Sequence, residues 1–437
     1  MDDCPLGDPV SVFFLPALAK ILLTFAVILV LSRYLPLWAC LFSGAAIVGL
    51  WMGLDPFQVI DHVWTYSFSA QSLWLILILG LILVLSDLLG KSGQLERIVS
   101  SFQGISPSPK FTVVAMPALI GLLPMPGGAI FSAPMVETTL RDDRVAPELK
   151  VAINYWFRHV VEFWWPLYPG TILAISLFGV EAWKMAAAQS PLSLGSVLGG
   201  VLFILPLLPS LSGTSRKFSS SDLGSFLTEI SPVLFVVIGI FVLQGLMEAI
   251  GYFFLIRIPW PQYLSFVIAL CGAIISVVLR NSLSFDLMKG AVLNKQILSI
   301  AMIILGIMAF KGLLVESKLM EMVKGELATY RIPPVAIIAV LPFIAGMVTG
   351  IAVAFVGSSF PLVISLIPEG NSPLPFAVLA YGFGYMGMML SPVHLCLLLT
   401  NEYFCADMMI EYRYLWRPAL FGLAFTILIF TAYRFIL

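Results

Sequence analysis

The chain has 437 residues, of which 60% are hydrophobic and 11% are charged, and its formal net charge is −1. So apolar a composition excludes a soluble globular protein and predicts a polytopic membrane protein in the lipid bilayer. The balanced charge offers no basic surface for nucleic acid, and no nucleic-acid partner is expected.

Ten apolar runs are long enough to cross a hydrocarbon core of roughly 30 Å, which takes about 20 helical residues. In chain order they are residues 12–31, 35–53, 73–89, 151–178, 192–208, 232–254, 263–279, 297–315, 375–399 and 418–435. The acidic N-terminus lacks the basic region of a cleaved signal peptide, so the first run is expected to remain as a span. The fold class predicted is therefore an all-α polytopic membrane protein with ten transmembrane helices.

Two further apolar runs, at residues 111–136 and 334–367, are interrupted near their middle. The first is broken by Pro124-Met125-Pro126-Gly127-Gly128, and the halves on either side are too short to cross the bilayer. The second offers the softer breaks Thr349-Gly350 and Gly357-Ser358-Ser359. Interrupted backbone at membrane depth is tolerated only where protein or a wet cavity satisfies it. Both runs are therefore predicted to be re-entrant hairpins that form a binding site.

Self-comparison at an offset of roughly 226 residues predicts two repeats. The landmark Tyr155 with Pro166 matches Tyr381 with Pro392. We predict repeat 1 over residues 1–209, a polar linker over 210–228 and repeat 2 over 229–437. Each repeat would hold five spans and one hairpin. An odd number of crossings makes the second repeat enter from the opposite side, which gives an inverted-topology repeat.

The distribution of Lys and Arg predicts the orientation in the membrane. Most basic residues fall on one side if the loop after the third span is cytoplasmic. We therefore expect the cell (inner) membrane, both termini extracytoplasmic, the first hairpin entering from the cytoplasm and the second from the exterior.

A tight cluster of ionisable residues lies in the fourth predicted span. Arg158, His159 and Glu162 follow Asn154 by one to two helical turns, before Pro166 breaks the helix. At 3.6 residues per turn, Asn154, Arg158 and Glu162 would share one helical face. Polar groups held in lipid are expensive, so the cluster is a hypothesis about function. The alternative is that Arg158 snorkels to the interface and pairs there with Glu162.

Two other groups of residues have simpler interpretations. Lys20 lies deep in the first span and is an open second candidate for a functional charge. The five cysteines show no pairwise metal spacing and are interpreted as packing residues. They are Cys4, Cys40, Cys271, Cys396 and Cys405.

The predicted site is suited to a small anionic solute. The half-helix that begins at Gly127-Gly128 would aim free N–H groups at the ligand, and Arg158 adds a permanent positive charge. The residues expected to bind substrate are Pro124, Met125, Pro126, Gly127, Gly128, Asn154, Arg158, Thr349, Gly350, Gly357, Ser358 and Ser359. Hydroxyls of the second hairpin either ligate Na⁺ or pack helices, and both interpretations stay open. His159, Glu162 and His394 are the candidates for carrying a coupling ion or proton.

The segments LIGLLPMPGGAIFSAPMV and NYWFRHVVEFWWPLYPG resemble the signature of a prokaryotic membrane family, domain of unknown function 401. That family is grouped with the ion-transporter superfamily of gluconate permeases, divalent anion/sodium symporters and arsenite permeases. The resemblance implies a homodimer whose protomers combine a scaffold domain with a transport domain that moves as an elevator. It also implies that both hairpin tips and both broken helices form the site. Divalent anion symporters carry Ser-Asn-Thr at each tip, where this chain has Pro-Met-Pro-Gly-Gly and Val-Thr-Gly, so dicarboxylate specificity and Na⁺ coupling do not carry over.

The leading hypothesis is a secondary active transporter of a small organic anion, coupled to Na⁺ or H⁺, with no cofactor beyond Na⁺ itself. The alternative is a Na⁺/H⁺ antiporter of the same architecture that works through Glu162. A remote alternative is an intramembrane enzyme with a metal on His159, Glu162 and His394, but two ligands on one turn are too few and no HExxH or GxSxG motif occurs. We therefore expect no enzymatic activity and assign no catalytic or metal-binding residue.

Overall fold

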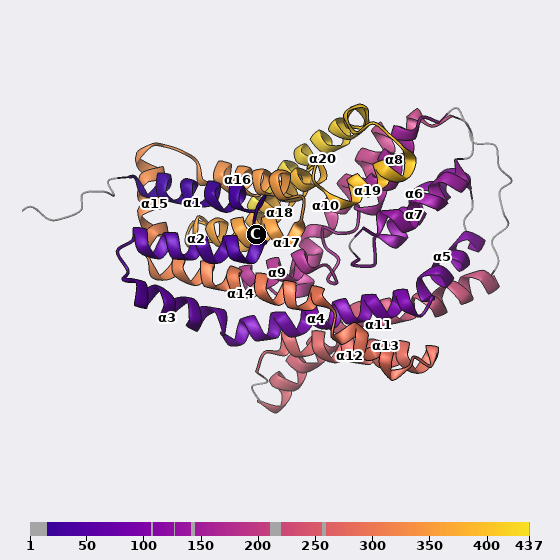
Figure 1. Ribbon diagram of the computed structural model, residues 1–437, viewed down its shortest axis with the longest axis horizontal. Coiled ribbons are helices and arrows are strands. Elements are labelled where there is room, and N and C mark those ends of the chain that lie inside the picture. The colour runs from indigo at the N-terminus through magenta and orange to yellow at the C-terminus, as the bar shows by residue number, and fades with distance from the viewer. Residues whose placement is uncertain are drawn as a thin grey trace, which may run out of the picture.

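A computed structural model describes residues 15–105, 108–125, 127–140, 145–209, 220–255 and 259–436. These residues form helices and no strand, which confirms the predicted all-α class (Figure 1). The helices are α1 (Ala17–Leu31), α2 (Leu37–Trp51), α3 (Pro56–Ser67), α4 (Ala70–Lys91), α5 (Gln94–Ile105), α6 (Pro109–Ile120), α7 (Ala129–Thr139), α8 (Pro147–Arg158), α9 (Pro169–Phe178), α10 (Ala182–Phe203), the 3-10 helix η1 (Leu205–Leu207), α11 (Ser220–Phe254), α12 (Pro261–Asn281), α13 (Phe285–Val292), α14 (Lys295–Glu316), α15 (Leu319–Thr329), α16 (Pro334–Thr349), α17 (Ala352–Ser365), α18 (Pro373–Met389), α19 (Leu395–Phe404) and α20 (Met408–Ile436).

Six helical segments in the described residues are long and apolar enough to cross a membrane, or seven if the bent pair α15 and α16 is one span. They are Ala70–Lys91, Ala182–Leu207, Asp222–Phe254, Pro261–Asn281, Phe285–Glu316 and Met408–Ile436. The predicted first two spans became α1 and α2, which have 15 residues each and therefore rise only about 22 Å. The predicted fourth and ninth spans are each two helices. The multi-pass membrane class is supported, and the count of ten spans stays a prediction.

Two pairs of short helices form the interrupted segments. α6 and α7 have 12 and 11 residues and contact each other across residues 121–128. α16 and α17 have 16 and 14 residues and contact each other across Gly350-Ile351. In Figure 1, α6 and α7 lie towards one end of the long axis, and α15 and the start of α16 lie at the other. Each arm is shorter than the roughly 20 residues that a crossing requires.

Each hairpin packs closely on the broken helix of its own half. α6 contacts α8, and α16 contacts α18. A Cβ at Gly121 would lie 2.0 Å from the Arg158 carbonyl oxygen, and a Cβ at Gly346 would lie 2.1 Å from the Gly384 carbonyl oxygen. Only glycine permits so close an approach of two backbones. The halves also meet directly, because α19 contacts both α7 and α8.

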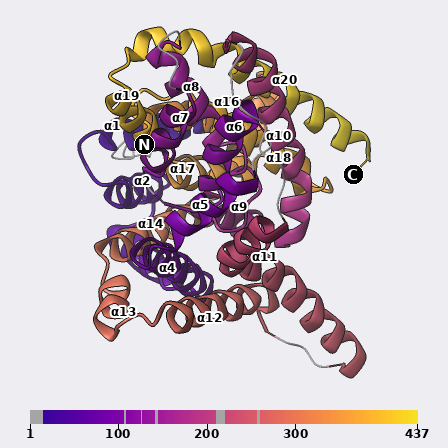
Figure 2. The same cartoon turned by 90° about the vertical axis from the view of Figure 1, so that its right-hand side faces the viewer.

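The helices recur in the same order in the two halves. The series from α4 to α10 consists of a long helix, a short helix, two hairpin arms, a broken helix and a second long helix. The series from α14 to α20 repeats this order. Figure 2 shows α11, α12 and α13 along one side of the molecule, with α4 between α12 and α14. Residues 220–228 of the predicted linker form the start of α11, and residues 210–219 lie outside the described residues. The repeat boundaries stay predictions.

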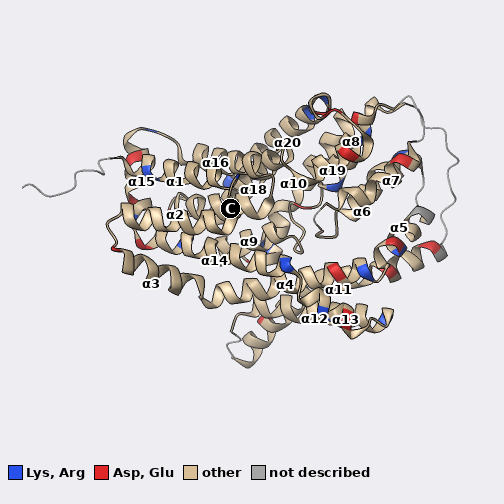
Figure 3. Cartoon of the chain, viewed as in Figure 1, with Lys and Arg blue, Asp and Glu red and all other residues tan. Residues whose placement is uncertain are grey.

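Charged side chains are unevenly placed. They gather around α5, α7, α8 and the start of α11, and few lie along α2, α14 and α16 (Figure 3). Lys20 is buried in α1, and its Nζ donates to the Trp51 carbonyl oxygen at 3.4 Å. Lys20 thus contacts the end of the neighbouring helix α2, and its functional role stays a prediction. The predicted orientation of the termini stays a prediction.

Candidate functional site

In each broken helix, the first arm ends before the proline that was predicted to break it. α8 ends at Arg158, and α9 begins ten residues beyond His159, at Pro169. Glu162 therefore lies in a turn, and the prediction that Asn154, Arg158 and Glu162 share one helical face is wrong for Glu162. The reason is long-range: the Tyr385 hydroxyl donates to the His159 carbonyl at 2.9 Å, and the Thr171 hydroxyl donates to the Glu162 carbonyl at 3.2 Å. These side chains satisfy carbonyls that the helix no longer pairs.

A cavity of ≈ 380 Å³ lies where the hairpin tips and helix breaks meet. Its lining includes eight of the residues predicted to form the site, and they come from both halves of the chain. These are Pro124, Met125, Gly127, Arg158, His159, Glu162, Gly350 and His394. Apolar side chains such as Ile300 and Ile303 of α14 line it as well. A largely apolar cavity with a few convergent polar groups is the usual form of a small-molecule site.

Arg158 is the permanent charge of the cavity and is only 2% exposed. Its Nη1 donates to Glu162 Oε1 at 2.5 Å, and its Nη2 donates to the Met125 carbonyl at 3.1 Å. Its Nε is buried and has no hydrogen-bond partner among the described residues. A Cβ at Gly128 would lie 2.8 Å from Nη2 and 3.1 Å from Nε. The snorkelling alternative is therefore wrong, although Arg158 does pair with Glu162.

Glu162 has a partner for each carboxylate oxygen. Oε1 accepts from Arg158, and Oε2 accepts from the Tyr385 hydroxyl at 3.0 Å. The Tyr168 hydroxyl beside them donates to the Gly121 carbonyl at 2.6 Å. A buried ion pair persists only when further hydrogen bonds satisfy its remaining groups, and the hydroxyl of Tyr385 supplies one of them.

Replacing Tyr385 with phenylalanine is expected to destabilise the protein by about 1.5–3 kcal/mol, the range for a hydrogen bond to a charged group. The hydroxyl serves both the Glu162 carboxylate and the His159 carbonyl, and it is buried. The control is Tyr66→Phe, because the Tyr66 hydroxyl bonds Glu316 at an exposed position where water replaces it. Melting temperatures of the purified variants measure the difference, and equal shifts for the two variants would contradict the assigned role.

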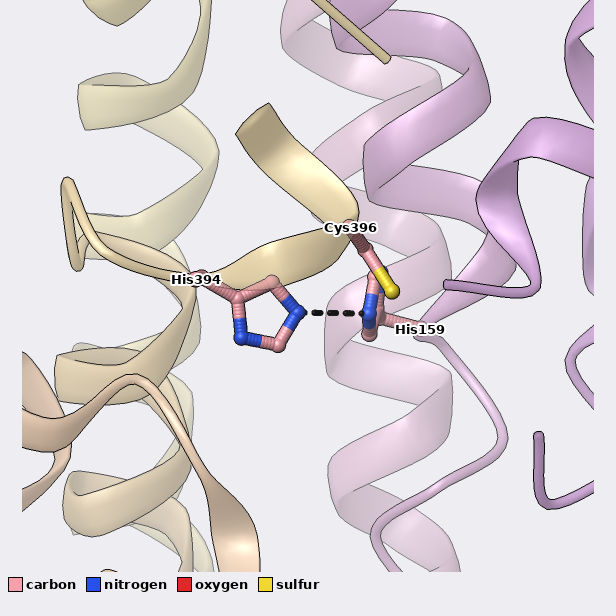
Figure 4. A group of neighbouring side chains, drawn as sticks. All are labelled: His159, His394 and Cys396. Carbon is pink, nitrogen blue, oxygen red and sulfur yellow. Dashed lines mark hydrogen bonds between the residues drawn. The ribbon is translucent and has the colours of Figure 1, made fainter. Parts of the chain in front are cut away.

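His159 and His394 point at each other (Figure 4), and both line the cavity. His159 follows the last residue of α8 and His394 precedes the first residue of α19, and their Nε2 atoms are 3.1 Å apart. His159 Nδ1 lies 2.6 Å from the Tyr155 carbonyl oxygen, and His394 Nδ1 lies 2.6 Å from the Gly350 carbonyl oxygen. A carbonyl only accepts, so this network assigns the N–H of each neutral ring to Nδ1. Both Nε2 lone pairs then point at the same place.

The other predicted residues lie away from the cavity lining. Asn154 is buried, and its amide nitrogen donates to the Ala129 carbonyl at 2.8 Å, which ties α8 to α7. Gly357 packs against Ile307. The hydroxyls of the second hairpin donate to carbonyls of their own helices, at 2.6 to 2.7 Å, and their assignment to ion ligation or to packing stays a prediction. They are those of Thr349, Ser358 and Ser359. Pro126 lies outside the described residues.

Three residues of the site were missed by sequence reasoning. Cys396, interpreted as a packing residue, lines the cavity, and so does Tyr168. Tyr385 reaches Glu162 from a position 223 residues away. The position of Cys396 two residues after His394, beside Pro392, was an available signal for the first of these. Nothing in the local sequence around Tyr385 indicates its partner.

A second cavity of ≈ 280 Å³ adjoins the first. Both are lined by Leu83, Pro124, Met125 and Gln296. The lining of the second cavity also includes Asp87 and Lys91, which form a salt bridge at 2.7 Å and are partly exposed. The tip of the first hairpin thus lines both cavities.

Comparison with known proteins gives a family and a fold. The model of the family described as "Protein of unknown function (DUF401)" matches residues 16–433. The chain also resembles the crystal structure of the Alcanivorax borkumensis YdaH transporter, described as having an unusual topology. That similarity has a TM-score of 0.56 at 12% sequence identity and covers 95% of this chain and 98% of the other. No curated protein matches the chain. The structural likeness at this identity shows a shared fold.

Proposed function

We propose that this chain, which belongs to the DUF401 family, is a secondary active transporter of a small organic anion of the carboxylate class. The observation that carries the proposal is the unpaired Nε of Arg158 at the wall of the central cavity. The fold shared with a protein described as a transporter supports the transport part of the proposal.

The surroundings of Arg158 favour an anion. Its Nε and Nη2 form one edge of the guanidinium, and that edge lies against Gly128, the N-cap of α7. A helix N-terminus carries partial positive charge and free N–H groups. Two positive elements this close together favour an anion beside them, in the adjoining cavity, because not even a Cβ fits between the edge and Gly128. A carboxylate fits the planar edge of arginine with two parallel hydrogen bonds.

The size of the cavity limits the solute. A volume of ≈ 380 Å³ is at the lower end of the range for small-molecule sites, about 300–1,000 Å³. The lining away from Arg158 is mainly apolar. We therefore propose a monoanion with a short apolar body rather than a highly charged solute.

The coupling ion is proposed to be Na⁺ or H⁺, and the mechanism to be alternating access of the elevator type within a homodimer. The hairpins pack on α8 and α18, so these elements are proposed to form the moving transport domain.

An exposed apolar stripe on α11 faces lipid or a second copy. It consists of Phe235, Ile238, Val242, Leu246 and Ile250. The assignment of His159, Glu162 and His394 to the coupling ion stays a prediction.

The Na⁺/H⁺ antiporter is the less favoured function. It requires Glu162 to exchange ions, yet both carboxylate oxygens of Glu162 have protein partners, one of them the guanidinium of Arg158. An antiporter would acidify or alkalinise vesicles on addition of Na⁺ without any organic solute, which a pH-sensitive dye detects.

A thermal-shift screen tests the proposal. The melting temperature of detergent-purified protein in EDTA is measured with monocarboxylates, sugar acids, phosphonates and NaCl added in turn. A ligand at 100 times its Kd stabilises the folded state by about 2.7 kcal/mol and so raises this temperature. We expect a monocarboxylate to raise the melting temperature of the wild type and not that of Arg158→Lys, which keeps the charge but loses the planar edge. Arg97→Lys is the matched control, because Arg97 pairs with Glu229 at a more exposed position.

Two outcomes would contradict the proposal. One is an equal shift by the same anion in Arg158→Lys, and the other is the absence of a shift with every anion in the screen. Uptake of the stabilising anion into proteoliposomes, with the Na⁺ or the H⁺ gradient dissipated in turn, then identifies the coupling ion.

A further inference from the structure

We propose that His159, His394 and Cys396 form a binding site for a thiophilic divalent metal ion such as Zn²⁺. One ring nitrogen of each histidine and the Cys396 Sγ lie within 4.8 Å of one another, and all three residues are buried (Figure 4). They come from the breaks of two different broken helices, α8 and α18–α19, and each lines the central cavity.

The arrangement of the two histidines suits a cation. Each Nδ1 donates to a backbone carbonyl at 2.6 Å, so each Nε2 presents a lone pair. The two lone pairs face each other at 3.1 Å and repel unless a positive centre lies between them. Metal-ligating histidines almost always donate their second ring N–H to a carbonyl or carboxylate, which is the arrangement found here for both rings.

The third ligand selects a metal rather than a proton. A thiolate is a soft ligand, and the combination of two imidazoles and one thiolate is used by zinc sites that keep a fourth position open. Tetrahedral bonds of about 2.0–2.3 Å place ligand atoms roughly 3.3–3.8 Å apart. The nitrogen pair, at 3.1 Å, needs to open by only about 0.2 Å to reach this range, and the sulfur needs to approach by at most about 1.2 Å.

The charges nearby are compatible with a bound cation. Arg158 is the one full positive charge in the cavity lining, and its pairing with Glu162 at 2.5 Å offsets it. A divalent ion on two neutral imidazoles and a thiolate leaves one net positive charge. The open fourth position would face the cavity, because all three ligands line it. The site therefore takes the metal with one further ligand, which is water or an anion.

Metal binding would connect two parts of the site. His394 holds the Gly350 carbonyl at the tip of the second hairpin, and His159 belongs to the break after α8. An ion held by both residues ties the second hairpin tip to the first broken helix. We expect Zn²⁺ to raise the melting temperature of the protein for this reason.

Titration of purified, metal-free protein with Co²⁺ tests the site. The wild type is expected to bind one ion per chain and to show the near-ultraviolet thiolate-to-cobalt band together with the visible bands of tetrahedral cobalt. Cys396→Ser should lose the thiolate band, and it should weaken Zn²⁺ binding by at least the 10–100-fold typical of an altered outer-shell residue. His394→Gln, which keeps a donor for the Gly350 carbonyl, should weaken binding as well.

The controls are residues of the same types elsewhere in the fold. His62→Gln on α3 and Cys271→Ser on α12 should leave stoichiometry, spectrum and affinity unchanged. Gel filtration and circular dichroism establish that each variant is folded. Wild-type protein that binds no stoichiometric Co²⁺, or a Cys396→Ser variant with the wild-type spectrum and affinity, overturns the metal site in favour of a proton shared between the rings.

The metal site does not depend on the proposed transport function. Metal binding is measured without organic anion, and the anion screen is run with EDTA. Failure of the cobalt titration therefore leaves anion binding intact. Failure of the anion screen leaves the metal site intact.

Discussion

Replacing Arg158 with methionine is expected to destabilise the protein by about 3–5 kcal/mol, the range for breaking a buried ion pair. The substitution leaves the Glu162 carboxylate buried with no cation paired to it and with the Tyr385 and Tyr168 hydroxyls beside it. It also removes the donor to the Met125 carbonyl at the tip of the first hairpin. Thermal unfolding of the purified variant should show the largest fall in melting temperature of any substitution in the cavity wall.

The double variant Arg158→Met/Glu162→Gln separates stability from binding. Removing both charges of a buried pair is often neutral for stability, and glutamine keeps an acceptor for Tyr385. We expect most of the lost stability to return while stabilisation by the anion stays absent. If the double variant regained the anion-induced shift, the guanidinium would not be the anion ligand. If it remained as unstable as the single variant, the ion pair would not be the cause of the loss.

Replacing Gly121 with alanine is expected to destabilise the protein by about 3 kcal/mol or more, at the upper end of the range for overpacking. The new Cβ would lie 2.0 Å from the carbonyl oxygen of Arg158, which is backbone and moves only if α8 moves. Separating α6 from α8 would also lengthen the bond from the Tyr168 hydroxyl to the Gly121 carbonyl, now 2.6 Å.

Gly245→Ala is the matched control for this substitution. Gly245 is also in a helix, α11, but a Cβ there meets nothing within 4 Å. Alanine at an open helical position stabilises by roughly 0.5–1 kcal/mol relative to glycine. The two variants should therefore shift the melting temperature in opposite directions. A Gly121→Ala variant as stable as the wild type would show that the first hairpin does not pack against α8 this closely.

The sequence predicted the parts of the site that depend on local chemistry. Prolines and glycines at residues 124–128 cannot continue a helix, and the structure ends α6 at Ile120 and begins α7 at Ala129. The pairing of Arg158 with Glu162 was part of the snorkelling alternative, and the structure shows it at 2.5 Å although Glu162 lies beyond the end of α8.

The parts that the sequence did not predict depend on distant residues. α8 ends at Arg158 because carbonyls beyond it accept from Thr171 and Tyr385, and no local signal ends the helix there. The role of Cys396 depends on a histidine of the other half of the chain. Serine and threonine suit both ion ligation and helix packing, so Ser358 and Ser359 could not be assigned from residue type alone.

The side chain of Asn154 has a consequence for how the two halves hold together. Its amide nitrogen bonds the Ala129 carbonyl at the start of α7 and lies 3.5 Å from the Thr400 hydroxyl of α19. The helix α19 of the second half thus packs against both α7 and α8 of the first half. We therefore expect the two halves to stay together when the chain is cut between them, because the contacts of α19 with α7 and α8 do not depend on the covalent connection.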